Sequence, residues 1–421
     1  MNTRTEAPVV VVGAGIVGMA AASFLQRDGR KVVVLDPGAP GEGASYGNAG
    51  CLNGSSVVPV SMPGTLSKVP GWLLDPEGPL TIRLRYLPVL LPWLWRFVRA
   101  GTPEKVAAQA RALRPLIAPS VETYRQLARD AGAEDLIHRA GHLMAYRSDA
   151  SFAGDAGANR LRSDNGVEIQ ELGADELRQL EPALSRDYVR GRLITENGHC
   201  ANPLRLVQSL AEMFVRRGGI IRRERVRDFA FDGVSVAEVF TDAGRQAASQ
   251  VVLAAGAWSR PLAAKLGDRV PLDTERGYHV MLKDPEVCPR IPTLSGEGKF
   301  VATPMEEGLR FAGTVEFAGL DAPPDWRRAR VLLRQGQQMY PGLARQIDEG
   351  RIKQWMGFRP SMPDSLPVIG TARAHPNALY AFGHGHIGLV AGAMTGRVIA
   401  DLAAGRPPAI DVTPFDVRRF A

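Results

Sequence analysis

The chain has 421 residues, of which 45% are hydrophobic and 23% are charged, and its formal net charge is +7 at pH 7. This composition is typical of a soluble globular protein and excludes a fibrous or disordered chain. The length favours two intertwined domains. The basic residues are scattered, and no block is long enough to indicate a nucleic-acid-binding arm.

The cysteines Cys51, Cys200 and Cys288 are odd in number and form no Cys-x-x-Cys motif. The sequence therefore predicts neither a disulfide framework nor a metal site, and a reducing, cytoplasmic compartment fits. Residues 1–8 contain no apolar secretion segment.

The first elements along the chain are a strand, a glycine-rich turn, a helix and a second strand. Residues 9–12 (VVVV) predict a short buried strand, residues 19–29 predict a helix that ends at Gly29, and residues 31–36 predict the second strand. The turn is a GxGxxG motif made of Gly13, Ala14, Gly15, Ile16, Val17 and Gly18. Its glycines permit a tight turn and the approach of a pyrophosphate to the helix N-terminus. Asp36 ends the second strand and can accept hydrogen bonds from a ribose, so the pattern predicts a dinucleotide site.

The following loop bears on which dinucleotide binds. Residues 41–54 (GEGASYGNAGCLNG) are mostly small, as backbone lying against a flat ring would require. This would favour FAD over NAD, but on composition alone a flexible surface loop is an equally good interpretation.

Residues 80–101 (LTIRLRYLPVLLPWLWRFVRAG) are apolar and aromatic, but arginines and prolines interrupt them, so a membrane-spanning helix is not expected. Trp93, Trp95 and Phe97 either belong to a core or interdomain contact or dip into a membrane interface. Both interpretations remain open.

Farther along, residues 202–218 predict an amphipathic helix with Asn202 as N-cap, and residues 235–258 predict a strand, a hairpin turn at 242–244 and a buried strand. Residues 80–195 are expected to be mostly helical with a strand near 141–147, and residues 275–355 to form a sheet plus one helix. A last helix is expected near 388–405. We expect residues 1–79, 196–274 and 356–421 to form one discontinuous domain and residues 80–195 and 275–355 to form a second.

Seven motifs are similar, in the same order, to those of the FAD-dependent D-amino acid dehydrogenase branch of the D-amino acid oxidase and glycine oxidase superfamily. They are VVVVGAGIVG…VVVLD, GASYGNAG, ENGHCANPLRLVQSLAE, VVLAAGAWS, RGYHV, GFRPSMPDSLPVIG and GHGHIGLVAGAMTGRVIADLAAG. The resemblance covers nearly the whole chain. It implies an α/β fold in which a Rossmann-type FAD-binding domain carries an inserted α+β substrate domain, and it implies non-covalent FAD.

The resemblance also implies which residues contact the cofactor. Besides the glycine motif and Asp36, these are Ser45, Asn48, Ala49 and Gly50 along the flavin, Val226 at the adenine, Ala255, Gly256 and Trp258 near the pyrophosphate, and Gly383, His384, Gly385, His386, Ile387 and Gly388 at the pyrimidine edge of the flavin. The last group leads into a helix, whose N-terminal dipole would stabilise negative charge on a reduced flavin.

The resemblance further implies that Arg359, in a loop stiffened by Pro360 and Pro363, holds the substrate carboxylate. A guanidinium stays charged and binds a carboxylate through two parallel hydrogen bonds. The alternative is a structural arginine paired with Asp364 or with an interdomain carboxylate.

Three further side chains are candidates for the same site. Tyr278 would give the substrate carboxylate a second contact, and His279 would line the same wall; packed rings are the alternative. His386 stands where this branch is expected to have a small hydroxylated residue, and it would face the substrate amine or cap the last helix.

The predicted reaction is oxidative deamination of a D-amino acid by hydride transfer from Cα to flavin N5, with electrons passed to a quinone or protein acceptor. The departures at His386 and in ERGYHV favour a bulkier, cyclic or hydroxylated substrate, such as a D-proline or hydroxy-D-proline. Peripheral membrane contact through residues 80–101 would reach quinones. The alternatives are an oxygen-using glycine or sarcosine oxidase, a nicotinamide dehydrogenase, and an FAD-holding subunit without activity.

Overall fold

The computed structural model describes residues 7–420. Most of the N-terminal stretch considered above for a secretion segment therefore lies outside the described residues.

A six-stranded sheet carries the glycine motif. In spatial order its strands are β10 (Ile220–Arg222), β2 (Val32–Leu35), β1 (Val9–Val12), β14 (Gln250–Leu253), β21 (Ala378–Phe382) and β20 (Val368–Thr371). All neighbours are parallel except β20, which runs antiparallel to β21. Residues 9–12 are buried throughout, because both faces of this sheet are covered.

The two faces of this sheet belong to two separate hydrophobic clusters. Val9 and Val11 pack in the cluster that contains the helices α1 (Ile16–Arg27), α4 (Pro103–Ile117), α5 (Ser120–Asp130), α9 (Pro203–Arg216) and α12 (Gly388–Ala403). Val10 and Val12 pack in the cluster that contains α10 (Ser259–Lys265) and a small sheet of β11 (Val226–Asp232), β12 (Ser235–Thr241) and β13 (Arg245–Ala247). Because successive side chains of a strand point to opposite faces, β1 contributes to both hydrophobic clusters.

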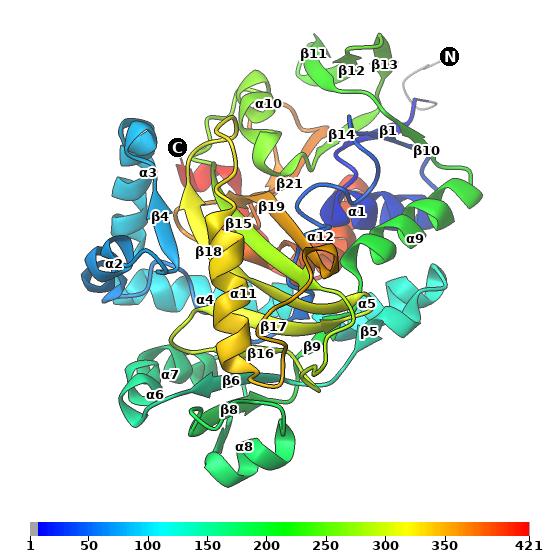
Figure 1. The fold of residues 1–421 in the computed structure, drawn as a ribbon. Helices are drawn as coiled ribbons and strands as arrows, with labels where there is room; N and C mark the ends of the chain where they lie inside the picture. The colour runs from blue at the N-terminus through cyan, green and yellow to red at the C-terminus, as the bar shows by residue number, and fades with distance from the viewer. Residues whose placement is uncertain (1–6, 421) are drawn as a thin grey trace.

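A second, mixed sheet has nine strands. Their path is β19 (Ile352–Ser361), β15 (Asp273–Leu282), β18 (Gly308–Phe317), β17 (Phe300–Met305), β16 (Thr293–Ser295), β6 (His142–Tyr146), β8 (Arg190–Ile194) and β7 (Gln170–Leu172), with β4 (Leu80–Ile82) paired to β18. Helix α11 (Arg327–Met339) lies across the front of this sheet, and α1 and α12 lie away from it beside the first sheet (Figure 1). The remaining helices are α2 (Thr65–Leu74), α3 (Leu87–Ala100), α6 (Asp149–Gly154), α7 (Ala156–Asp164) and α8 (Ala174–Leu180), and a small sheet joins β3 (Cys51–Leu52), β9 (Gly198–Cys200) and β5 (Ile137–His138).

One local prediction was wrong, and one strand was missed. Residues 357–361 do not form a loop but complete β19, and Pro360 is tolerated there because β19 is an edge strand that need not donate every backbone hydrogen bond. The hairpin turn at 242–244 leads into β13, a short strand that the sequence analysis missed, and the buried strand β14 pairs instead with β1 and β21. Since β15 begins at Asp273 and β19 ends at Ser361, both strands cross the expected domain seams, and the domain division stays a prediction.

The segment at residues 80–101 divides its aromatic side chains between interior and surface. Trp93 is buried, with its ring centroid 5.3 Å from those of both Phe97 and Phe317, whereas Trp95 is 63% exposed. Among residues 7–420, no helix is long and apolar enough to cross a membrane.

Candidate active site

A cavity of about 1360 Å³ extends from the glycine motif to the face of the nine-stranded sheet. Residues expected at a cofactor border it in the following groups: Gly13 to Val17, Asp36, Ser45, Asn48, Ala49, Val226, Ala255, Gly256, Trp258 and His384 to Gly388. Three expected cofactor residues, Gly18, Gly50 and Gly383, are not in its wall. The structure thus brings together segments that lie near opposite ends of the sequence, as residues 13–17 and 384–388 show.

The nucleotide end of the cavity is built by close backbone packing. Gly13 has φ +112°, and a Cβ there would lie 2.4 Å from the carbonyl oxygen of Ala254. A Cβ on Gly18 would lie 1.9 Å from the carbonyl oxygen of Gly13, so Gly18 acts through packing rather than contact. Ser45 Oγ accepts a hydrogen bond from the Ile16 N–H at 2.9 Å, which ties the small-residue loop to the start of α1.

Asp36 has a double role at this end. Its carboxylate accepts hydrogen bonds from the Ala14 N–H at 2.8 Å and the Gly38 N–H at 2.7 Å, and it also borders the cavity. It therefore holds the glycine turn in place and keeps a negative charge where a ribose would lie.

The small-residue loop is fixed by two side chains of the nine-stranded sheet. Arg310 Nη1, from β18, donates to the carbonyl oxygens of Tyr46 at 3.1 Å and Asn48 at 2.5 Å. His279 Nδ1, from β15, lies 3.1 Å from the Gly47 carbonyl oxygen. Burial and the charge of Arg310 lower the pKa of His279 to about 3, so the ring is neutral and donates through Nδ1. The loop is therefore an ordered wall of the cavity.

His279 itself is not in the cavity wall. Its ring stacks on Trp355 with centroids 5.2 Å apart, and Trp355 is the side chain that borders the cavity. A Cβ on either Gly47 or Gly357 would lie 1.9 Å from the Trp355 ring. The absence of a side chain at both positions leaves room for the indole ring.

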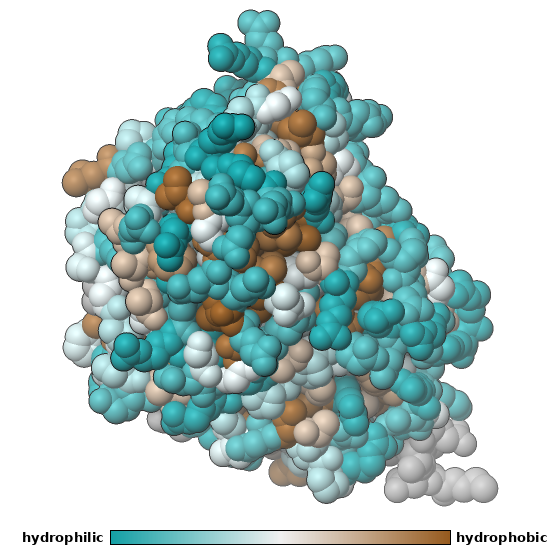
Figure 2. Space-filling view, turned by 90° about the horizontal axis from the view of Figure 1, so that it is seen from below, coloured by the Kyte–Doolittle hydropathy of each residue, from teal (hydrophilic) through white to brown (hydrophobic). Residues whose placement is uncertain are grey.

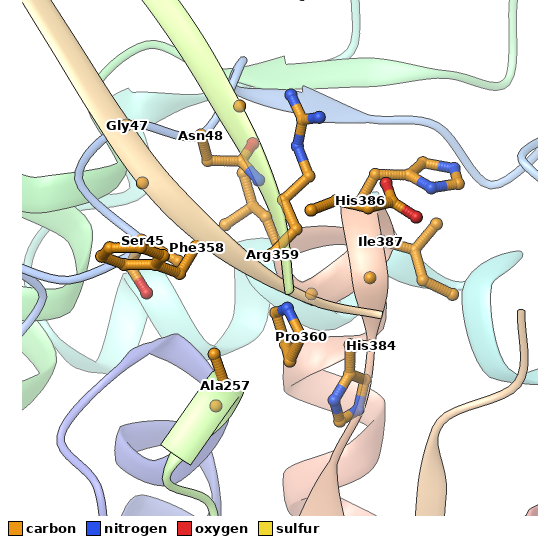
Figure 3. Close-up of a pocket in the computed structure, with 18 of the residues that line it drawn as sticks. Ser45, Gly47, Asn48, Ala257, Phe358, Arg359, Pro360, His384, His386 and Ile387 are labelled. Atoms are coloured by element: carbon orange, nitrogen blue, oxygen red, sulfur yellow. The ribbon is translucent and has the colours of Figure 1, made fainter. Parts of the chain in front are cut away.

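Arg359 borders the cavity at the end of β19. Its Nη1 donates to the carbonyl oxygen of Thr314 at 2.9 Å and its Nη2 to that of Gly313 at 3.4 Å, at a bulge in β18 where Thr314 has φ +59°. In Figure 3 its side chain extends away from His384 and across the adjacent strand. Asp364, the alternative partner, is instead paired with Arg419 at 2.8 Å.

Tyr278 lies on the opposite face of β15 from Arg359. Arg359 pairs with Glu275 in the register of the two strands, and Tyr278 is three residues farther along, so its side chain points the other way. Its hydroxyl donates to Glu316 at 2.5 Å and accepts from the Asp325 N–H at 2.9 Å. Tyr278 is among the residues that border the cavity, but its hydroxyl is engaged in this buried network, so its contact with the substrate carboxylate stays a prediction.

The two histidines of GHGHIG have different environments. His384 is buried and its Nε2 is 3.0 Å from Thr395 Oγ1 in α12, so its side chain belongs to the helix packing. His386 borders the cavity, and burial together with the nearby Arg359 charge lowers its pKa to about 4. His386 is therefore a neutral group in the same region of the cavity as Arg359 (Figure 3).

Sequence reasoning missed five residues of this site: Gly277, Glu275, Thr314, Arg310 and Trp355. Glu275, Gly277 and His279 alternate along β15 and lie opposite Arg359, Gly357 and Trp355 of β19. An antiparallel pairing of ERGYHV with WMGFR would have placed these side chains on one face. Thr314 and Arg310 carry no local signal, because the role of Thr314 depends on the bulge in β18 and that of Arg310 on contacts with the distant loop at residues 46–48.

The residues present fit FAD. Positions 13 and 18 admit only glycine, the N-terminus of α1 lies at the same end of the cavity, and Gly388 to Val390 at the N-terminus of α12 border the other end. The first can hold a pyrophosphate and the second can stabilise a reduced flavin.

Comparison with known proteins agrees with this geometry. The family model described as FAD dependent oxidoreductase (DAO) matches residues 8–402. A protein of Bradyrhizobium diazoefficiens named D-amino-acid oxidase is 46% identical over 98% of both chains, and one of Mesorhizobium japonicum named D-amino acid dehydrogenase 2 is 30% identical over 96% of this chain and 98% of that protein.

Solved structures share the fold. Glycine oxidase from Geobacillus kaustophilus gives a TM-score of 0.72 at 21% identity, covering 97% of this chain and 98% of that one. L-proline dehydrogenase from P. horikoshii gives 0.73 at 17% identity, covering 98% and 97%. The predicted fold class and the resemblance are both confirmed, and the chain belongs to the DAO family of FAD-dependent oxidoreductases.

Proposed function

We propose that this protein oxidises a D-amino acid with FAD, which it binds non-covalently. The observation that carries the proposal is Arg359, a guanidinium in the cavity wall beside the small-residue loop. The names of the two relatives, D-amino-acid oxidase and D-amino acid dehydrogenase 2, support the same substrate class.

Arg359 binds the substrate carboxylate. Among the described residues, the carbonyl oxygens of Gly313 and Thr314 engage two of its N–H groups, which holds the guanidinium and leaves other donors for a ligand. Trp355 and the loop at 46–48, fixed by His279 and Arg310, then set the distance between the substrate and the cofactor. Bound FAD would supply the acceptor for the Cα hydride.

The cavity has an apolar arm that supports delivery of electrons to a quinone. It reaches α2, β4 and α3 through the side chains of Val69, Trp72, Leu80, Ile82, Leu94 and Phe97. Helices α2 and α3 also carry exposed hydrophobic residues that do not border the cavity: Leu73, Leu74, Val89, Leu91 and Trp95. The surface in Figure 2 is mostly hydrophilic, with hydrophobic residues in separate patches. An apolar face flanked by Arg83, Arg85, Arg96 and Arg99 suits peripheral contact with an anionic membrane, where quinones reside.

The neutral His386 in the cavity wall supports a hydroxylated substrate, such as a hydroxy-D-proline, since an imidazole can hydrogen-bond a ring hydroxyl. An oxygen-using amine oxidase is the second candidate, because the more similar of the two relatives is named an oxidase.

An anaerobic screen of D- and L-amino acids that follows loss of the flavin colour tests the proposal. We expect bleaching by D-enantiomers, with D-proline derivatives ahead of D-alanine. Bleaching by L-enantiomers alone, or by none, would refute it. A peroxide assay in air separates the acceptors, because only an oxidase forms peroxide stoichiometrically. Acid precipitation should release all flavin to the supernatant if the cofactor is non-covalent.

A further inference from the structure

Glu275 is a buried carboxylate next to Arg359 that the proposed mechanism has not used. It lies on β15 directly opposite Arg359 on β19, so both side chains are on the same face of the sheet. Glu275 is 5% exposed and borders the cavity. Arg359 and Glu275 thus present opposite charges side by side at one wall.

The partners of Glu275 leave part of its carboxylate open. Oε1 accepts a hydrogen bond from Ser361 Oγ at 2.6 Å. Within residues 7–420, no further side-chain hydrogen bond to Glu275 and no lysine, arginine or histidine nitrogen within 4 Å of it is found, so this cavity-lining carboxylate has no cation of the described residues in contact. A buried carboxylate in this position is costly unless a cation binds it.

We propose that Glu275 binds the ammonium group of the substrate and accepts its proton. This inference rests on the proposed function, since a zwitterion matches the pair: its carboxylate meets Arg359 and its ammonium meets Glu275. The N–H bond breaks, an O–H bond forms on Glu275, and the nitrogen keeps the electron pair that becomes the C=N bond when the Cα hydride leaves. Glu275 returns the proton to water when the product departs.

The charged and titratable surroundings are consistent with this proton transfer. Burial raises the pKa of Glu275, while the Ser361 hydrogen bond and the charge of Arg359 lower it. Asp273, two residues away on β15, raises it in turn and is itself held by the Tyr86 hydroxyl at 2.8 Å. His386, which also borders the cavity, is neutral because burial and the charge of Arg359 lower its pKa to about 4. Glu275 is therefore the carboxylate of this group that borders the cavity.

Two ligands of one shape test the ammonium contact on the holoenzyme. Neither 2-aminoisobutyrate nor 2,2-dimethylpropanoate has an α-hydrogen, so neither is oxidised, and they differ only by an ammonium in place of a methyl group. Calorimetric titration of wild type should show at least tenfold tighter binding of the amine. In Glu275→Gln this preference should fall by about tenfold or more. Asp273→Asn, which changes a buried carboxylate outside the cavity wall, should keep the wild-type preference.

The inference is overturned if wild type does not prefer 2-aminoisobutyrate over 2,2-dimethylpropanoate, or if Glu275→Gln keeps the wild-type preference. If Glu275 only balances the charge of Arg359, the substitution would tighten both ligands equally, which also overturns it. The wild-type comparison needs no variant and stands even if Glu275→Gln loses its flavin.

As a second readout, kcat/KM of Glu275→Gln should rise about tenfold per pH unit up to the pKa of the substrate amine, whereas kcat/KM of wild type should depend less steeply on pH. If a D-amino acid bleaches the wild-type flavin normally but Glu275→Gln leaves the preference for 2-aminoisobutyrate unchanged, this inference alone is refuted. If no D-amino acid bleaches the wild-type flavin, the proposed function is refuted.

Discussion

Gly277 sets the position of Arg359, and its replacement by alanine tests that relation. A Cβ on Gly277 would lie 2.3 Å from Arg359 Nη2 and 2.4 Å from Cζ, whereas ordinary contacts begin near 3.4 Å. The guanidinium must therefore move by about 1 Å. Gly277 has no positive φ, so the backbone itself accepts alanine without strain.

The expected loss follows from the chemistry of the displaced group. A misplacement of about 1 Å costs about 100-fold in rate, and one hydrogen bond to a charged partner contributes about 1.5–3 kcal/mol, equivalent to about 10- to 150-fold. We expect Gly277→Ala to lower kcat/KM for the preferred D-amino acid by about 100-fold while the flavin content stays that of wild type.

Steady-state kinetics with a non-oxygen electron acceptor measures this effect, and absorbance of the bound flavin measures cofactor content. Gly157→Ala in α7 is the control, because a Cβ there meets no atom within 4 Å. Unchanged kcat/KM in Gly277→Ala would refute the claim that this strand position orients the guanidinium.

Three further predictions concern the supports of the site. Arg310→Met removes the donor to Tyr46 and Asn48, so the Kd for FAD should rise by about tenfold or more, measured by flavin fluorescence during dilution; unchanged retention would contradict this. His279 has a pKa near 3 in the fold and about 6.5 unfolded, so below pH 6.5 only the unfolded ring takes up a proton, and folding stability falls by up to about 1.4 kcal/mol per pH unit; urea unfolding at pH 7 and 5 should show a flatter dependence in His279→Gln. Trp95→Ser should weaken sedimentation with anionic vesicles several-fold and leave kcat/KM for a soluble acceptor unchanged; equal sedimentation would argue against membrane contact through α3.

Local sequence patterns predicted the nucleotide end of the cavity in detail. Residues 9–36 combine a buried strand, fixed glycine spacing and a terminal acid, and each of these acts over a few residues. Asn202 was likewise predicted as an N-cap from its neighbours alone, and its side chain accepts from the Arg205 N–H. Such features follow from local backbone geometry.

The substrate end could not be predicted in the same way because it depends on strand pairing. Arg359 was expected in a loop, but β19 pairs with β15 along ten residues and brings Glu275 beside it. Tyr278 was expected to give the substrate carboxylate a second contact, but its hydroxyl donates to Glu316, a partner that strand pairing and not local sequence brings near. The left-handed Thr314, whose carbonyl oxygen anchors Arg359, has no signature in its own sequence.

Anaerobic titration of Arg359→Ala and Arg359→Lys with the preferred D-amino acid tests the central claim most directly. Both variants should retain flavin, because Arg359 donates to carbonyl oxygens of Gly313 and Thr314 in β18 rather than to the glycine motif. The substrate concentration that bleaches half the flavin should rise by at least 100-fold in Arg359→Ala and by less in Arg359→Lys, which keeps the charge without the bidentate geometry. Half-bleaching of Arg359→Ala at the wild-type concentration would contradict the account.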